Sequence, residues 1–147
     1  MYLVVLSFWH GKNPEPKIAK RNIHVWKGLI KLNNKPYTTP FRNTTILFLK
    51  GVAIQTAVLR REICRHETGF YYIVNEGIHA ALTKRKIRSI FDKIVPSEYQ
   101  SFHHAIIPKG SKYYIGKIVE QDIVSNQLLV FETEEDYKQY RKKNYSF

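Results

Sequence analysis

The sequence predicts a single α+β domain, with a mixed or antiparallel sheet and two or three helices. A chain of 147 residues suits one hydrophobic core, so residues 1–147 are expected to form one basic globular domain. Apolar residues make up 44% and aromatic residues 14% of the chain, which favours strands because aromatic rings pack well on a pleated surface. Two segments, residues 83–94 and 133–144, instead begin with typical helix caps.

The first third of the chain is predicted to contain strands separated by turns. The apolar start, MYLVVLSFWHGKN, is interpreted as a buried strand because it is too short to span a bilayer. A loop with two prolines covers residues 10–22, and residues 23–32 alternate as a strand. Residues 33–45 hold two more prolines and are interpreted as turns, whereas residues 46–50 form a short apolar strand.

The middle of the chain is less regular. Residues 52–67 are expected to form a helix, although their apolar positions do not fall on one clean stripe. Residues 69–74 are predicted to be a strand that continues as residues 78–82 after a turn. Further along the chain, residues 126–131 are predicted to form another strand.

The helix that follows Thr83 has the clearest helical pattern. Thr83 is a typical N-cap, and Pro96 is expected to end the helix. A second helix follows Thr133, with acids in its first turn and bases in its last, the order that the helix dipole favours. The apolar residues behind Thr83 keep the spacing of one buried face: Ile87, Ile90, Phe91 and Ile94.

The stretch AIIPKGSKYYIGK, residues 105–117, raises the question of a phosphate-binding loop. A Walker-type loop needs Gly-x-x-x-x-Gly-Lys-Ser/Thr ahead of a helix, but PKGSKYY has one glycine and precedes a strand. We interpret it as a type I turn with Pro108 at i+1 and Gly110 at i+3. The turn is expected to join residues 102–107 and 112–119 as a hairpin.

The net charge is +12, and the excess lies in the first half of the chain. Residues 1–65 carry twelve basic residues and two acids, whereas residues 66–147 carry twelve and ten. A field of this sign attracts nucleic acid, a phosphorylated small molecule or an acidic protein surface. A solvated, lysine-rich surface without a ligand is the alternative, and composition alone does not decide between them.

The segment TKRKIRSIF places positive charge at a helix N-terminus, against the helix dipole. Local rule-breaking is expected where function lies, and an anion there would meet both basic side chains and backbone N–H groups. Basic residues in RREICR and in the PKGSK turn are further anion-binding candidates. The residues expected to bind nucleic acid or another partner are Arg60, Arg61, Arg65, Lys84, Arg85, Lys86, Arg88, Lys109 and Lys112.

Metal and nucleophile chemistry find little support in the sequence. The six histidines show no metal-binding spacing, and His103 and His104 face opposite ways in a strand, so no metal is expected. Arginines beside Cys64 would lower the pKa of its thiol, but its apolar spacing suits an inert buried cysteine. The single cysteine allows no internal disulfide, and neither a signal peptide nor a membrane span is expected.

The runs IIPKGSKYYIG and DIVSNQLLVF, with GIHAALTK upstream, resemble the C-terminal part of small bacterial and bacteriophage proteins. The order of elements over residues 23–131 is also distantly similar to the ADP-ribosyltransferase fold. The second resemblance implies NAD as a cofactor, with His24 and His79 as catalytic candidates. The first implies a cytoplasmic location in a bacterial host, or the virion of a phage.

The sequence therefore favours a non-catalytic accessory protein, phage-related, that uses a basic surface to bind nucleic acid or an acidic protein, without a cofactor. One alternative is an ADP-ribosyltransferase-like enzyme, or a degenerate relative that binds a nucleotide without turning it over. A structural subunit of a larger assembly is the other.

Overall fold

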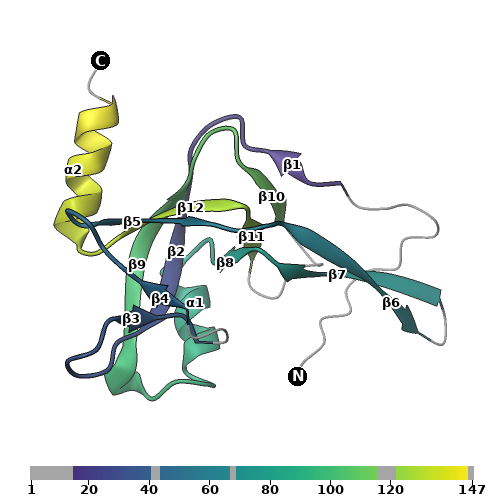
Figure 1. Cartoon of the computed structure of the whole chain (residues 1–147), viewed down its shortest axis with the longest axis horizontal. Helices are drawn as coiled ribbons and strands as arrows, with labels where there is room; N and C mark the ends of the chain where they lie inside the picture. Colours follow the sequence, from purple (N-terminus) through teal and green to yellow (C-terminus); the bar gives the residue numbers. More distant parts are fainter. Residues whose placement is uncertain (1–14, 41–43, 67–68, 116–121, 146–147) are drawn as a thin grey trace.

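The computed structural model describes residues 15–40, 44–66, 69–115 and 122–145, apart from the side chains of residues 62–66, 69–75 and 144–145. These ranges form an antiparallel six-stranded sheet, an antiparallel four-stranded sheet, a two-stranded ribbon and two α-helices (Figure 1). The predicted α+β class is confirmed. No helix within these ranges is long and apolar enough to cross a membrane.

The six-stranded sheet is the centre of the fold. In spatial order its strands are β4 (Thr45–Ile46), β3 (Tyr37–Thr38), β2 (Ile23–Ile30), β9 (Gln100–Ile107), β12 (Gln127–Phe131) and β5 (Val52–Thr56). β2 and β9 pair along their whole length, from Ile23 opposite Ile107 to Ile30 opposite Gln100. Their side chains alternate between two faces, so each face of this sheet has its own set of contacts.

The four-stranded sheet covers one face of the larger sheet. Its order is β1 (Lys17–Ile18), β10 (Lys112–Ile115), β11 (Ile123–Ser125) and β8 (Ile78–Ala80). The main core lies between the sheets, where Val25, Leu29 and Ala105 from one pack with Ala80 and Ile123 from the other. The ribbon of β6 (Arg60–His66) and β7 (Gly69–Glu76) extends away from this core (Figure 1).

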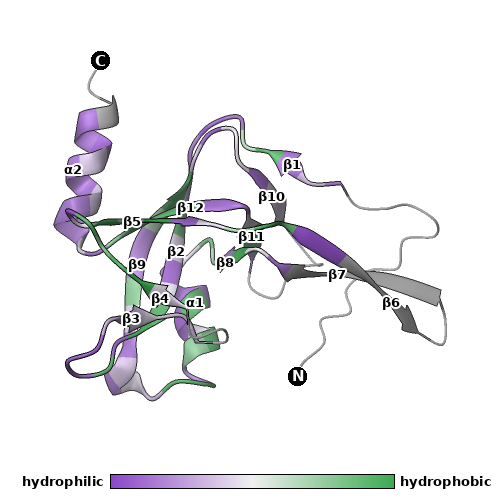
Figure 2. Cartoon of the chain, in the orientation of Figure 1, coloured by the Kyte–Doolittle hydropathy of each residue, from purple (hydrophilic) through white to green (hydrophobic). Residues whose placement is uncertain are grey.

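Two helices pack on the other face of the six-stranded sheet. α1 (Lys84–Phe91) inserts Ile87 and Phe91 against Trp26 and Phe102. α2 (Glu134–Tyr145) is hydrophilic along most of its length (Figure 2) and contacts the sheet through Tyr137, which packs with Ile106 and Phe131. A short 3-10 helix, η1 (Ser97–Tyr99), leads from α1 into β9.

Both predicted helix caps are present. The Thr83 Oγ1 accepts a hydrogen bond from Lys86 N at 3.1 Å. The Thr133 Oγ1 accepts one from Asp136 N at 3.1 Å, while the Asp136 carboxylate accepts from Thr133 N at 3.1 Å. This reciprocal pair fixes the start of α2 as a capping box does.

The prediction of a helix over residues 52–67 is wrong, because this segment forms β5 and β6. A tight turn at Lys50 and Gly51, with φ of 53° and 82°, leads into β5, which then pairs with β12. Inward Ala53 alternates with outward Ile54. That two-residue alternation is the physical reason why the apolar positions made no helical stripe.

The hairpin expected around residues 108–111 is also wrong. β9 pairs with β2 and β12, whereas β10 lies in the other sheet. Ser111 N donates to Pro108 O at 3.0 Å and Gly110 has φ of 90°, so glycine occupies the third position of a type II turn and not the fourth of a type I turn. The turn is held by the chain before β2, since Gly110 N donates to Ala19 O at 2.8 Å.

The end of α1 differs from the prediction. The helix stops at Phe91, and Pro96 instead precedes η1. Ile94, expected to be buried, is 44% exposed, and Val95 takes its place in the core. The strand expected near the N-terminus lies outside the described residues, as does the end of the strand expected over residues 112–119.

Candidate nucleic-acid interface

The four cations of α1 are exposed. In the described parts of the chain, none of them forms an ion pair with a carboxylate. Ile87 and Phe91 occupy the buried side of the helix, so the basic residues fall on its remaining sides, as the helical spacing predicted. The cations are Lys84, Arg85, Lys86 and Arg88.

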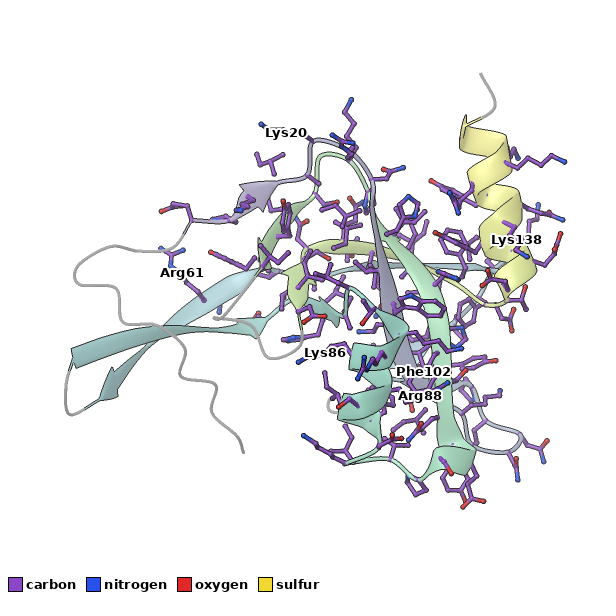
Figure 3. All side chains as sticks on the ribbon, turned by 180° about the vertical axis from the view of Figure 1, so that it is seen from behind. Lys20, Arg61, Lys86, Arg88, Phe102 and Lys138 are labelled. Carbon is purple, nitrogen blue, oxygen red and sulfur yellow. The ribbon has the colours of Figure 1, made fainter. Side chains whose placement is uncertain are left out.

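Two of these cations lie over aromatic rings of the sheet. Lys84 Nζ is 5.4 Å from the ring centre of Trp26, and Arg88 Cζ is 5.6 Å from that of Phe102. Lys84 and Arg88 are one helical turn apart and therefore share a side of α1. Figure 3 shows Arg88 and Phe102 together at α1. Contact with the rings restricts both side chains while their charged groups remain at the surface.

Gly28 explains how α1 comes so close to the sheet. A methyl group at Gly28 would lie 2.5 Å from two ring atoms of Phe91. Only a residue without a side chain lets the ring come this close to β2. The close contact holds the last turn of α1 against the sheet.

A row of stacked rings crosses the sheet from α1 to α2. The ring centres of Trp26 and His104 are 3.8 Å apart, and those of His104 and Tyr137 are 3.9 Å apart with nearly parallel planes. Lys84 approaches the row at Trp26, and Arg141 of α2 approaches Tyr137 with its Cζ 5.5 Å from the ring centre. We call Trp26, His104 and Tyr137 the ring row, which has a cation at each end.

The two histidines at the ring row are held in the neutral form near pH 7. Burial lowers the pKa of His104, and the charges of Arg141, His24 and Lys84 lower it further, against the effect of Glu134 at 2.9 Å. Burial and Arg141 also lower the pKa of His24, whose Nδ1 is hydrogen-bonded to the Tyr137 hydroxyl at 2.9 Å. An anion bound near Arg141 would weaken these repulsions and raise both pKa values.

A backbone N–H group just before α1 already has an acidic hydrogen-bond partner from a distant part of the chain. The Asp122 carboxylate accepts a hydrogen bond from Leu82 N at 2.9 Å, just before the helix begins. Together with the Thr83 cap, it supplies the negative partner that the first turn of the helix lacks. The basic side chains, more than the backbone N–H groups, are therefore the groups that an anion would meet at this end.

The other predicted binding residues lie elsewhere. Arg60 pairs with Glu76 at 3.3 Å, and Arg61 donates to the Tyr114 hydroxyl at 3.1 Å, so both take part in local contacts. The side chain of Arg65 lies outside the described residues. Lys109 and Lys112 are exposed at the turn beyond β9, roughly 20 Å along the strand from Phe102 at 3.3 Å per residue. The structure thus does not join these residues with the α1 cations in one patch.

The two catalytic candidates are on different sheets. His24 lies on β2 beside Tyr137, whereas His79 lies on β8 opposite Val124. The backbone oxygen of His79 accepts a 2.7 Å hydrogen bond from Lys27 Nζ. Lys27 is 7% exposed, and burial lowers its pKa to about 8.

His103 and His104 do face opposite sides of β9, as expected. His103 is buried and donates through Nδ1 to the backbone oxygens of Phe131 and Glu132, at 3.0 and 3.1 Å. Its Nε2 contacts the Ser101 hydroxyl at 2.7 Å. These bonds make His103 a structural residue that links β9 to the end of β12.

Sequence reasoning missed the ring row and Arg141. The alternation of residues 23–32 does place His24 and Trp26 on one face, and Tyr137 and Arg141 are four residues apart on α2. Their meeting depends on the pairing of β2 with β9 and on the docking of α2, which no local pattern reveals.

No group of three or more metal-binding side chains occurs in the described residues.

Comparisons with known proteins add no assignment. No protein-family model matches the chain, and no curated protein or solved structure matches it either.

Proposed function

We propose that the protein binds nucleic acid along α1 and the adjoining sheet face, as a non-catalytic accessory protein. The observation that carries this proposal is the set of exposed cations on α1, which form no ion pair with the described part of the chain and two of which lie over Trp26 and Phe102. Phosphates bind such cations without regard to sequence, and the half-buried rings beside them offer contacts to unstacked bases.

Single-stranded nucleic acid fits this surface better than a duplex. Lys84 and Arg141 stand at opposite ends of the ring row, so a flexible backbone can follow the row from α1 to α2. Cations that track a backbone next to aromatic rings are the usual combination in proteins that bind single strands. A duplex would meet the cations, but its paired and stacked bases would not reach the rings.

Fluorescence anisotropy with a labelled single-stranded oligonucleotide tests the proposal. Affinity should fall steeply between low and moderate salt, because each neutralised phosphate releases counterions. The Trp26→Ala variant should weaken binding of the single strand by about 1–3 kcal/mol and leave binding of a duplex nearly unchanged. Absence of binding at low salt would overturn the proposal and leave an acidic protein as the partner of the α1 cations.

The alternative is an ADP-ribosyltransferase-like activity in which His24, exposed and hydrogen-bonded to the Tyr137 hydroxyl, would be a catalytic residue. Incubation with labelled NAD, followed by mass spectrometry of the protein and of added acceptor proteins, tests this alternative. His24→Ala and His79→Ala should each abolish the label. Labelling that survives both substitutions would contradict the assignment of these residues.

A further inference from the structure

β5 is the outermost strand at one end of the six-stranded sheet, and within the described residues its only ladder is to β12. A bridge between Val52 and Leu49, with N–O distances of 2.9 and 3.2 Å, closes the start of its outer edge, so the open edge begins after Val52. Residues 51–59, GVAIQTAVL, contain no charged residue and no proline. Edge strands are ordinarily protected by lysines, prolines or bulges, because their free N–H and C=O groups pair readily with another chain. In a chain with 24 Lys and Arg residues, the uncharged edge indicates a surface that is covered in use.

The side chains around this edge support the same reading. Four large apolar residues in and around β5 are 60–79% exposed: Leu47 and Leu49 before the strand, Ile54 within it and Val58 after it. Figure 2 shows the stretch entering β5 in hydrophobic colours. Exposed large apolar residues that gather along one segment are typical of an interaction site.

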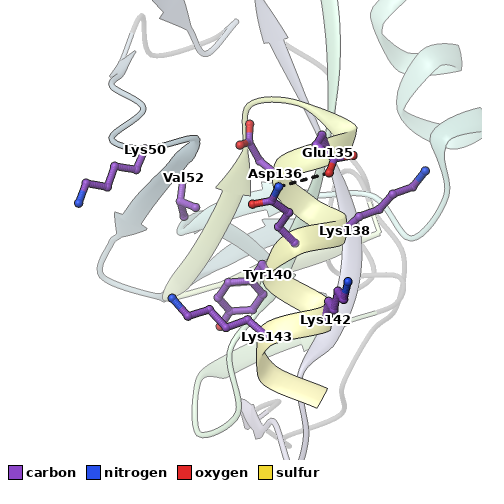
Figure 4. Close-up of a pocket in the computed structure, with 9 residues that line it drawn as sticks. Lys50, Val52, Glu135, Asp136, Lys138, Tyr140, Lys142 and Lys143 are labelled. Carbon is purple, nitrogen blue, oxygen red and sulfur yellow. Dashed lines mark hydrogen bonds between the residues drawn. The ribbon is translucent and has the colours of Figure 1, made fainter. Parts of the chain in front are cut away.

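Lysines stand where this edge meets α2. A shallow depression of about 610 Å³ has Val52 and Tyr140 in its lining, and Figure 4 shows Lys50 and Lys143 on the same side as these two residues. Lys138 and Lys142 also line the depression, although Figure 4 draws them across the helix from Lys143. Within the described chain, neither Lys50 nor Lys143 forms an ion pair.

The two carboxylates at the depression are used locally. Asp136 accepts from Thr133 in the cap of α2, and the Glu135 carboxylate accepts from Gln139 Nε2 at 3.3 Å. The turn at Lys50 is fixed against α2, because Glu132 N donates to Gly51 O at 2.9 Å and Gly51 lies against Asp136. The depression therefore keeps a fixed shape and a positive rim at Lys50 and Lys143.

We propose that β5 takes an extended acidic segment of a partner protein as an added strand. Backbone groups of the segment would pair with the edge of β5 beyond Val52, and its apolar side chains would cover Ile54 on the face that carries α2. Its acidic residues would lie at the Val52 end, next to Lys50 and Lys143. This surface does not include α1, so the α1 cations stay available to nucleic acid while the acidic segment is bound.

A second copy of this chain fits the same edge poorly. Antiparallel pairing of two β5 strands about the middle of residues 51–59 would bring Lys50 of each copy close to Arg60 of the other. Each copy also carries a net charge of +12, which opposes self-association. Nucleic acid fits poorly as well, because the edge itself offers uncharged and apolar groups.

A synthetic fluorescent peptide tests the proposal with the full-length protein. The probe alternates valine and threonine and carries aspartates at one end, and a control probe carries lysines in their place. We expect the acidic probe to bind and to slow amide hydrogen exchange in β5. The charge reversal Lys50→Glu/Lys143→Glu should weaken binding by at least about tenfold. The control Lys20→Glu/Lys109→Glu makes the same change in net charge at exposed lysines that do not line the depression, and it should leave binding nearly unchanged.

A substitution in the middle of β5 gives a second test. Ile54→Thr should weaken binding of the acidic probe, while thermal melting should show an intact fold because residue 54 is exposed. Equal loss in both double variants, absence of binding, or protection outside β5 would overturn the proposal. A concentration-dependent dimer that Ile54→Thr dissociates would replace the acidic partner with a second copy. Oligonucleotide binding by α1 is measured separately, so failure of one proposal leaves the other standing.

Discussion

Lys27 is the residue whose protonation is most tightly linked to folding. Its ammonium group is buried on β2, and its pKa falls to about 8 from 10.5 because burial disfavours the charged form. Between these two values the unfolded chain binds more protons than the folded protein. The free energy of unfolding therefore rises with pH across this window, by about 3 kcal/mol for a shift of this size.

Lys27→Met tests this linkage. At pH 7 the variant should be more stable than the parent by about 2 kcal/mol, because the desolvation cost disappears while one hydrogen bond to His79 O is lost. Near pH 10.5 the parent should be the more stable of the two, because neutral Lys27 keeps its hydrogen bond to His79 O without the cost of burying a charge. Urea unfolding at both pH values measures the difference. Parallel curves for the two proteins would mean that Lys27 titrates normally.

Three histidines predict a loss of stability in acid. Burial is the largest cause of the lowered pKa values of His24, His103 and His104. The unfolded chain therefore takes up protons first as the pH falls below about 6.5, and the free energy of unfolding decreases. Thermal melting between pH 7.5 and pH 5 should show a falling Tm, and His103→Gln should make the fall shallower. A Tm independent of pH would contradict the neutral assignment.

For these residues the sequence predicted the direction of each side chain but not its partner. Alternation over residues 23–32 correctly separates Val25 and Lys27 from His24 and Trp26, and the opposite directions of His103 and His104 follow from the same rule. The partner of Lys27 is the backbone of β8, which lies 52 residues further along the chain. A local pattern gives the direction of a side chain but not what it meets.

At the scale of the element, α1 depends on the absence of a side chain at Gly28. A methyl group there would meet the Phe91 ring, whose side chain is fully buried and cannot turn away. Gly28→Ala should therefore lower the free energy of unfolding by about 1–3 kcal/mol by pushing α1 off the sheet. In a Phe91→Leu background the same substitution should cost less. Equal costs in both backgrounds would show that the ring is not the obstacle.

The helices were more predictable than the edge strands. Capping residues at Thr83 and Thr133 are local signals, and both helices begin where these signals place them. The segment over residues 52–67 carried no such signal, and its strands are set by pairing with β12 and β7. The compensating charge of Asp122 at the start of α1 is equally non-local, so the basic first turn looked more anomalous in sequence than it is in the fold.

At the scale of the molecule, the cations divide into separate surfaces. Figure 3 places Lys20, Arg61 and Lys138 well apart from the cluster of Lys86 and Arg88 at α1. The excess positive charge of residues 1–65 is thus not one patch, because β9 and β12, from the second half of the chain, lie between β2 and β5 in the six-stranded sheet. Charge counts along the sequence predicted the sign of the field, and the helix-dipole rule singled out the α1 cations, but neither predicted the ring row beside them.

The most direct test of nucleic-acid binding compares two triple charge reversals. One variant carries Lys84→Glu, Arg85→Glu and Lys86→Glu on α1. The control carries Lys20→Glu, Lys109→Glu and Lys112→Glu around the type II turn at the far end of β9. Both sets are exposed and both change the net charge equally, so any difference between them reflects the location of the charges.

Anisotropy titration of a labelled single strand against the parent and both variants, at one fixed salt concentration, gives the answer. The α1 reversal should reduce affinity by about two orders of magnitude or more, since it removes three phosphate contacts and adds repulsion. The control should lose at most about tenfold through the general field. Equal losses in the two variants, with thermal melting showing both folded, would contradict α1 as the nucleic-acid interface.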